Sequence, residues 1–358
     1  MQPEGSKIIV NARFLTQPVT GVQRFAIEIC LRLQGLIPGI TFVSPKNILQ
    51  KEVAQKLGVV TFGRFSSHLW EQLELPGYLK KNNKPLLVNL CNTAPLFYSK
   101  SIVCIHDIAF KVNPKWFSPA FVALYKFLIP QIAQRSLKVI TVSQFSRKAI
   151  AVYTGINPDK IEVVYNGLTQ VFFSETTSSF NLPDENFILT VSSVDPRKNL
   201  ISLVKAFKKA QLPNYKLIIV GSESKVFADV GLKEEIKDCP SIIFTGYLPD
   251  NDLATLYKKA SIFVYPSLYE GFGIPPLEAM ASGVATIVSD VAALPEICGD
   301  ASLYVNSVDI AEITAKMQLL VENDNLRQDL IKKGYKQIVK FNWDESAKQV
   351  AFLLKQHL

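Results

Sequence analysis

Several features that define common protein classes are absent from this chain of 358 residues. Its five cysteines are an odd number without CxxC spacing, which argues against a disulfide framework and a structural zinc site. No apolar run approaches the roughly 18 residues that span a bilayer. The first residues, MQPEGSKIIV, lack the basic and apolar regions of a signal peptide. We therefore expect a cytoplasmic protein whose cysteines mostly lie in its core.

Familiar catalytic and nucleotide-binding motifs are also missing. Without HExxH or a GxSxG elbow, a hydrolase would have neither a zinc site nor a nucleophile. The chain has no Walker loop and no GxGxxG followed by an acidic residue, so an NAD-dependent oxidoreductase is the weakest of the enzyme classes considered.

The chain does carry an excess of positive charge, with 39 Lys and Arg against 31 Asp and Glu. Such a balance suits nucleic acid, an anionic membrane face or a phosphorylated substrate. No arginine-rich tract, zinc finger or RNP-like aromatic stripe accompanies it, so we expect no nucleic-acid partner. A solvated basic surface is the simplest interpretation of the charge taken alone.

Short apolar runs recur along the chain, each bounded by turn residues. They are continuous rather than alternating, which is typical of parallel strands buried on both faces. Helical patterns lie between several of them, so the sequence predicts an α/β fold with open, doubly wound parallel sheets. The predicted strands are 7–12, 85–90, 101–106, 138–143 and 161–166 in the first half, and 187–193, 216–221, 242–247, 261–266 and 285–290 in the second.

The length exceeds what one ordinary core supports, so we expect two domains. The stretch 168–186 breaks the strand and helix rhythm, is rich in Ser, Thr and Asn, and reads as a linker. We therefore predict Rossmann-like domains at 1–170 and 171–340. Ligands of such sheets bind outside the carboxyl ends of the strands.

The stretch 270–278, EGFGIPPLE, follows the predicted strand 261–266 and opens a helix. Its two glycines let backbone amides approach a ligand, and its prolines suit a first helical turn, which is where we expect Glu278. Amides at a helix start can hold a phosphate, while carboxylates accept hydrogen bonds from hydroxyls. A nucleotide sugar has both groups. Alternatively, Glu278 caps its own helix and Glu270 is a surface turn residue.

Three further loops follow predicted strands. Arg197 and Lys198 could neutralise a diphosphate, or be solvated loop charges. Gly21 opens a helix and could admit a phosphate, or simply form a turn. His106, one of three histidines, could serve acid/base chemistry or sugar binding, or be structural. The triplet 250–252 has the DxD pattern, but it directly precedes a helix, so we interpret its acids as helix-capping residues and predict no metal.

Together these segments resemble the retaining glycosyltransferases of the GT-B fold that carry an E-x7-E motif, glycosyltransferase family four. Glu270 and Glu278 have that spacing. The resemblance covers most of the chain and is most specific over the last of its segments. These read TGVQRF, WEQLELP, HDIAF, TVSQFSR, YNG, PRKN and SLYEGFGIPPLEAMASGVATIVSDVAALPEICGDASLYV.

The resemblance implies two Rossmann-like domains facing across a cleft, with the acceptor on the first and the nucleotide sugar on the second. It also implies a helix within 341–358 that crosses back to the first domain. The implied donor site comprises Gly21, Arg197, Lys198, Glu270, Gly271, Phe272, Gly273 and Glu278, with His106, Lys198 and Glu270 in catalytic roles. Glu270 and the amides of Phe272 and Gly273 would hold the sugar, Glu278 the ribose, and Lys198 the diphosphate.

One position departs from the family pattern. Many members carry Gly-Arg where this chain has Ser192 and Ser193, so Arg197 is a substitute candidate for the missing cation. The resemblance implies transfer, without a cofactor, from a nucleoside-diphosphate sugar to a glycan or lipid-linked acceptor. GDP-mannose is the first choice of donor and UDP- or dTDP-sugars are alternatives. The basic balance would suit peripheral contact with an anionic inner membrane face. A nucleotide-sugar 2-epimerase and a non-catalytic nucleotide-sugar-binding protein are the alternative functions.

Overall fold

The structure is a computed structural model, and it describes residues 7–174, 185–221, 231–237 and 239–358. Part of the predicted linker, 175–184, lies outside the described residues. The chain forms two compact units, and each is described by itself. Unit 1 comprises 1–111, 120–167 and 342–358, and unit 2 comprises 112–119 and 168–341.

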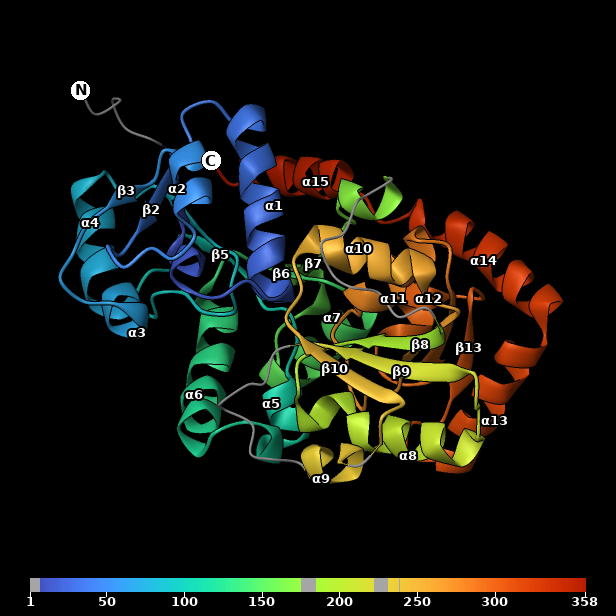
Figure 1. Cartoon of the computed structure of the whole chain (residues 1–358). Coiled ribbons are helices and arrows are strands. Elements are labelled where there is room, and N and C mark those ends of the chain that lie inside the picture. Colours follow the sequence, from blue (N-terminus) through green and yellow to red (C-terminus); the bar gives the residue numbers. More distant parts are fainter. Residues whose placement is uncertain (1–6, 175–184, 222–230, 238) are drawn as a thin grey trace. The chain divides into compact units, whose positions relative to one another are not determined.

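Unit 1 is built on a seven-stranded parallel sheet of order β3-β2-β1-β4-β5-β6-β7 (Figure 1). Its strands are β1 Ile8–Asn11, β2 Thr41–Ser44, β3 Val60–Thr61, β4 Leu86–Asn89, β5 Ser101–Cys104, β6 Lys138–Thr141 and β7 Ile161–Val163. Its helices are α1 Gly21–Leu36, α2 Lys51–Leu57, α3 Ser67–Leu69, α4 Leu75–Lys81, α5 Ala109–Val112, α6 Pro119–Arg135, α7 Gln144–Thr154 and α15 Trp343–Lys355. A π-helical turn, Trp70–Glu74, joins α3 to α4.

Unit 2 is built on a six-stranded parallel sheet of order β10-β9-β8-β11-β12-β13. Its strands are β8 Asn186–Val191, β9 Tyr215–Val220, β10 Ile242–Gly246, β11 Ile262–Tyr265, β12 Ala285–Ser289 and β13 Ser302–Val305. Its helices are α8 Leu200–Ala210, α9 Leu232–Ile236, α10 Asp250–Lys259, α11 Ile274–Ala281, α12 Leu294–Cys298, α13 Ile310–Glu322 and α14 Asp324–Ile338.

The predicted fold class is confirmed, and each of the ten predicted strands is present. Three further strands, β2, β3 and β13, were not predicted. β3 has only two residues, and Val60 in it is 42% exposed, so it lacks the continuous apolar run that marks a buried strand. β2 and β13 have four residues each. The apolar run of β2 ends before Ser44, and that of β13 begins after Ser302.

Apolar side chains close each sheet against its helices. In unit 2, Leu203, Val204 and Phe207 of α8 share one buried cluster with strand residues and with Ile313 and Met317 of α13. In unit 1, a smaller cluster gathers Ile9, Val43 and Leu87 of the sheet around the fully buried Trp70. Of the cysteines, Cys30, Cys104 and Cys298 are buried, as the sequence predicts, and all five have free thiols. Among the described helices, none is long and apolar enough to span a membrane.

Helix α15 packs on unit 1, beside α1 (Figure 1). Ser346 Oγ donates to the carbonyl of Tyr165 at 2.7 Å, and the Trp343 and Phe25 rings meet edge to face at 6.0 Å. At Gly167 a Cβ would lie 2.3 Å from the backbone nitrogen of Trp343, so only glycine permits this approach. The last segment of the chain therefore completes the first unit.

Both sheets reverse their strand order at one point. In unit 1 the reversal lies between β1 and β4, and in unit 2 between β8 and β11. Connections leave such neighbouring strands toward opposite faces, which opens a crevice at their carboxyl ends. Residues that directly follow β1, β4, β8 and β11 are therefore the ones this topology places for ligand binding.

Candidate functional site

Two of the predicted site residues, Lys198 and Glu270, meet at the switch point of unit 2. Lys198 ends a 3-10 turn, Pro196–Lys198, in the loop after β8, and Glu270 lies in the loop after β11. Lys198 Nζ lies 2.5 Å from Glu270 Oε1, and both side chains are about nine-tenths buried, with 11% and 9% exposed. The sheet topology thus joins a cation and a carboxylate that stand 72 residues apart in the chain.

A third side chain, Tyr265, completes this contact and was not predicted. Its hydroxyl accepts from Lys198 Nζ at 2.8 Å and donates to Glu270 Oε1 at 2.9 Å. Burial raises the pKa of Tyr265 well above its usual value, so the hydroxyl keeps its proton. Tyr265 is the last residue of β11, and that position at a switch-point strand was the available sequence signal.

Lys198 and Glu270 each stabilise the charged form of the other. Burial alone would raise the pKa of Glu270, but the cations Lys198 and Arg197 outweigh it and the pKa is lowered. Burial also lowers the pKa of Lys198, and the neighbouring Glu270 carboxylate opposes that shift. The pair is therefore a buried cation and anion that each depend on the other.

The loop after β8 is held in shape by its own side chains. Asp195 Oδ1 accepts from the backbone N–H of Arg197 at 2.9 Å, and Asp195 Oδ2 lies 3.6 Å from Arg197 Nη2. The Arg197 carbonyl accepts from the N–H of Leu268 at 2.8 Å, which ties the loop after β8 to the loop after β11. Arg197 therefore lies next to Lys198 in the same cluster and pairs with Asp195.

Close backbone approach also shapes this end of the sheet. Gly221 follows β9 directly, and a Cβ on it would lie 1.8 Å from the carbonyl oxygen of Ser192. Ser192 in turn donates its N–H to the carbonyl of Val220 at 2.8 Å. Ser192 and Ser193 therefore begin the loop against a glycine that no larger residue could replace without a shift.

The EGFGIPPLE turn opens helix α11 as predicted, with the prolines in its first turn and Gly283 in the left-handed region after its end, at φ +76°. Gly273 is the N-cap at φ +102°, and a Cβ there would lie 2.6 Å from Leu294 Cδ2. The ring of Phe272 packs edge to face on Phe341 at 5.6 Å. These packed neighbours fix the helix start beside Glu270, and Gly271 between them is buried as well.

One prediction about this helix is wrong. Glu278 was expected in the first turn, but α11 begins at Ile274, so Glu278 lies in its second turn. It is buried at 8% exposure, and Tyr257 donates its hydroxyl to Glu278 Oε2 at 3.1 Å. A tyrosine from α10 thus helps to hold this carboxylate in place.

Gly21 and His106 lie in unit 1. Gly21 is the first residue of α1, and Thr20 before it donates its N–H to Gln23 Oε1 at 3.2 Å. His106 follows β5 at 6% exposure, with Nε2 2.9 Å from the carbonyl of Leu90 and its ring edge to face with Phe25 at 5.2 Å. Burial lowers the pKa of His106, so the ring is neutral at pH 7.

The positions of Asp250 and Asp252 in the DxD triplet differ slightly from the predicted capping position. The N-cap of α10 is Pro249, and Asp250 and Asp252 lie inside the first turn, where they face the positive end of the helix dipole. Over the described residues, no group of three or more His, Cys, Asp and Glu side chains is placed to hold a metal ion.

Comparisons with known proteins match both halves of the chain. Residues 19–169 match the family model described as Glycosyltransferase Family 4, and residues 173–337 match the one described as Glycosyl transferases group 1. The O-antigen chain mannosyltransferase RfbU of Salmonella typhimurium is 28% identical over 96% of this chain and 98% of its own. The O-antigen chain mannosyltransferase B of Escherichia coli is 27% identical over the same shares.

Solved structures agree on the fold. Sucrose-phosphate synthase from Thermosynechococcus elongatus superposes with a TM-score of 0.77 at 20% identity, covering 98% of each chain. Anabaena HepE in complex with UDP and glucose superposes with a TM-score of 0.77 at 17% identity, covering 98% of this chain and 99% of its own.

Proposed function

Because this chain belongs to the glycosyltransferases of the GT-B fold, we propose that it transfers a sugar, with retention of configuration, from a nucleoside-diphosphate sugar to an acceptor hydroxyl. The observation that carries the proposal is the buried cluster of Lys198, Glu270 and Tyr265 at the switch point of unit 2. It sets a cation for a diphosphate beside a carboxylate for sugar hydroxyls, next to the start of a helix.

The proposed mechanism separates leaving-group stabilisation from sugar binding. As the donor bond breaks, negative charge grows on the diphosphate, and Lys198, Arg197 and the amides at the start of α11 stabilise it. Glu270, with the amides of Gly271, Phe272 and Gly273, holds the sugar. Glu278 binds the ribose hydroxyls.

No side chain acts as a covalent nucleophile in this proposal. A phosphate oxygen of the leaving group takes the proton of the attacking hydroxyl while the anomeric carbon is cation-like. His106, held neutral by burial, supplies a hydrogen bond near the transferred sugar. Gly21 at the start of α1 approaches the phosphates, and water exclusion protects the donor from hydrolysis.

We further propose mannose as the sugar, with GDP-mannose as donor, in the synthesis of a polysaccharide or its lipid-linked precursor. The support is that two full-length relatives are named O-antigen chain mannosyltransferases. Because HepE was solved in complex with UDP, the identity of the nucleotide must be tested with several nucleoside diphosphates.

A melting screen followed by a transfer assay tests the proposal. A nucleoside diphosphate that binds the folded state at 100 times its Kd should stabilise it by about 2.7 kcal/mol, so one of GDP, UDP, dTDP and ADP should raise Tm clearly above the others. The matching donor should then yield an α-linked product from an α-linked donor by NMR. Epimerised free nucleotide sugar without acceptor would indicate a 2-epimerase, and donor binding without turnover a non-catalytic binding protein.

The distribution of charge supports a peripheral membrane partner. Unit 1 holds 21 Lys and Arg against 10 Asp and Glu, whereas unit 2 holds 18 against 21. The whole basic excess thus belongs to the unit that the family resemblance assigns to the acceptor. We propose that unit 1 contacts the anionic cytoplasmic face of a membrane, where a lipid-linked acceptor is presented.

Vesicle sedimentation tests the membrane contact. The protein should sediment with phosphatidylglycerol vesicles at 0.05 M salt and be released at about 1 M, where the screening length falls to about 3 Å. Phosphatidylcholine vesicles serve as the control. Equal sedimentation with both lipids would contradict an electrostatic contact.

A further inference from the structure

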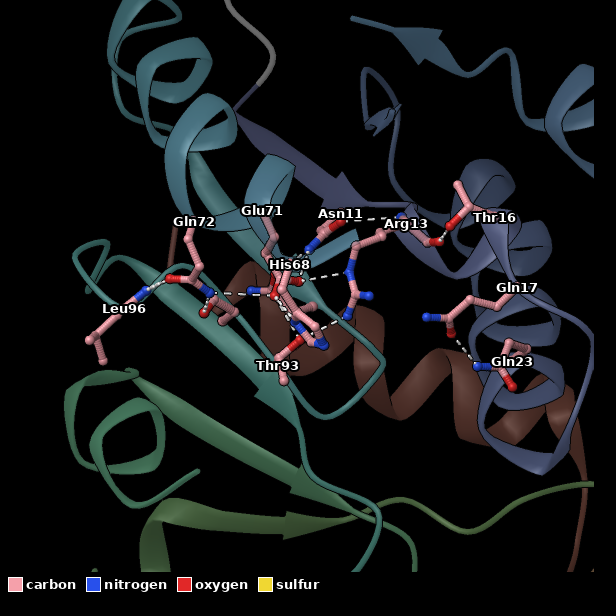
Figure 2. A network of polar contacts seen from close by, with 12 residues as sticks. Asn11, Arg13, Thr16, Gln17, Gln23, His68, Glu71, Gln72, Thr93 and Leu96 are labelled. Carbon is pink, nitrogen blue, oxygen red and sulfur yellow. Dashed lines mark hydrogen bonds and ion pairs between the residues drawn. The ribbon is translucent and has the colours of Figure 1, made fainter. Parts of the chain in front are cut away.

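A second polar cluster lies at the switch point of unit 1 and is not used by the proposed donor chemistry. Its centre is Glu71, which is fully buried at 0% exposure in the π-helical turn (Figure 2). Glu71 Oε1 accepts from Asn11 Nδ2 at 2.8 Å and from Arg13 Nε at 3.2 Å, and Oε2 accepts from Thr93 Oγ1 at 2.7 Å. Two other segments of the chain, at the ends of β1 and β4, therefore converge on this carboxylate.

The position of this cluster is the one where the topology favours a ligand. Asn11 ends β1 and Asn89 ends β4, the two strands that flank the reversal, and Asn11 Nδ2 also donates to Asn89 Oδ1 at 3.0 Å. Arg13 follows β1 and donates through Nη2 to Thr93 Oγ1 at 2.9 Å. The cluster thus occupies in unit 1 the place that Lys198 and Glu270 occupy in unit 2.

The backbone directly before His68 has an unusual conformation. Ser67 has φ +52°, a conformation that costs free energy in a residue other than glycine. The π-helical turn begins three residues later, at Trp70, and such turns are frequent at functional sites. His68 and Glu71 are three residues apart, and His68 Nδ1 lies 3.5 Å from Glu71 Oε2. The His68 ring also meets the Tyr125 ring edge to face, with 6.2 Å between their centroids.

His68 is the exposed member of the cluster. Its side chain is 29% exposed, against 1% for Glu71 and 5% for Arg13. With Nδ1 facing a carboxylate, the neutral ring carries its proton there, which leaves Nε2 as a hydrogen-bond acceptor. The contact is still too long for a good hydrogen bond, as is common for such pairs before a substrate is bound.

The cluster also contains donors without an acceptor. Arg13 Nη1 and Asn89 Nδ2 are both buried and have no hydrogen-bond partner. Buried donors are costly to leave unpaired, so a polar site that retains two of them is suited to receive an oxygen atom. A sugar hydroxyl is such a group, because its oxygen accepts while its hydrogen donates.

We propose that the cluster of Asn11, Arg13, His68, Glu71 and Asn89 binds a hydroxyl of the sugar acceptor. His68 Nε2 accepts from that hydroxyl, and Glu71 is a positioning residue that orients the imidazole. Arg13, Asn11 and Thr93 keep the carboxylate in place. This inference rests on the proposed function, since it assigns the acceptor of that reaction.

The first test separates acceptor use from donor chemistry. His68→Gln should lower kcat/KM for a mannoside acceptor about 10-fold to 100-fold, the range for losing one hydrogen bond to a substrate hydroxyl. Slow transfer to water from the donor, and affinity for the nucleoside diphosphate, should stay within twofold of the parent. His357→Gln, a histidine of the same unit beyond α15, is the control and should change neither. Unchanged transfer, or transfer and hydrolysis that fall together, would overturn the assignment.

The second test does not depend on turnover. The imidazole NMR signals of His68 should shift on titration with methyl α-mannopyranoside, and the shift should be lost in Glu71→Gln protein that still melts cooperatively. If the parent shows no transfer but the His68 signals shift, the acceptor site stands and the proposed reaction fails. If the signals stay fixed at saturating mannoside, the acceptor site is wrong whatever the enzyme does.

Discussion

Replacing Lys198 by alanine should lower the rate of sugar transfer by about 100-fold or more at saturating donor, with the protein still folded. The side chain places its ammonium 2.5 Å from Glu270 and 2.8 Å from the Tyr265 hydroxyl, inside a largely buried cluster. Removing one preorganised electrostatic stabiliser typically costs two to three orders of magnitude in turnover. Initial rates of nucleoside-diphosphate release, with and without acceptor, measure the effect.

The matched control for this variant is Lys209→Ala. Lys209 is exposed in the last turn of α8, on the helix that follows the Lys198 loop, so the same chemical change is made away from the cluster. The control should transfer at the parent rate within twofold. Near-normal transfer by Lys198→Ala, measured with donor saturating, would remove this lysine from the mechanism and leave Arg197 as the cation to test.

Replacing Arg13 by methionine should destabilise unit 1 by about 3–5 kcal/mol. The substitution keeps most of the apolar stem but leaves Glu71 as a buried charge without its cation, and breaking one partner from such a pair has this cost. Urea unfolding followed by circular dichroism measures it. Arg64→Met, at an exposed arginine of the same unit, should change stability by no more than about 0.5 kcal/mol.

The same ion pair predicts a pH dependence. Burial by itself would raise the pKa of Glu71, but the attraction of Arg13, the nearby His68 and the hydrogen bond from Thr93 lower it from 4.5 to about 2. A carboxyl whose folded-state pKa is depressed stabilises the fold above its unfolded pKa, and the contribution fades as pH falls from 4.5 toward 2. The difference corresponds to about 3 kcal/mol. Arg13→Met should flatten this part of the profile, and an unchanged acid limb would show that Arg13 does not set the Glu71 pKa.

The strands could be predicted from the sequence because a strand that is buried on both faces of its sheet has a continuous apolar run. β8, β11 and β12 are such runs, whereas β3 is two exposed residues and has no such signature. Loops after the predicted strands were therefore placed correctly, which is why Lys198 and Glu270 were both named before their contact was known.

The sequence does not predict which residues distant in the chain form side-chain contacts. Tyr265 stands 67 residues from Lys198, and Glu71 stands 60 residues from Asn11. The spacing of residues along the chain does not predict such contacts, because they depend on the register of parallel strands and the order of the sheet. The misplacement of Glu278 has a local cause, since α11 begins at Ile274, before the proline pair, which makes Glu278 the fifth residue of the helix.

The return of α15 to unit 1 has a consequence for synthesis. Residues 168–341 can emerge from the ribosome and fold while the unit begun earlier still lacks its closing segment, 342–358. The indole of Trp343, which will cover Gly167 and Phe25, reaches the nascent unit only after every residue of unit 2 has been made. The unit translated first is therefore the last to mature, and a premature stop near residue 341 would leave unit 1 incomplete although every residue of unit 2 has been made.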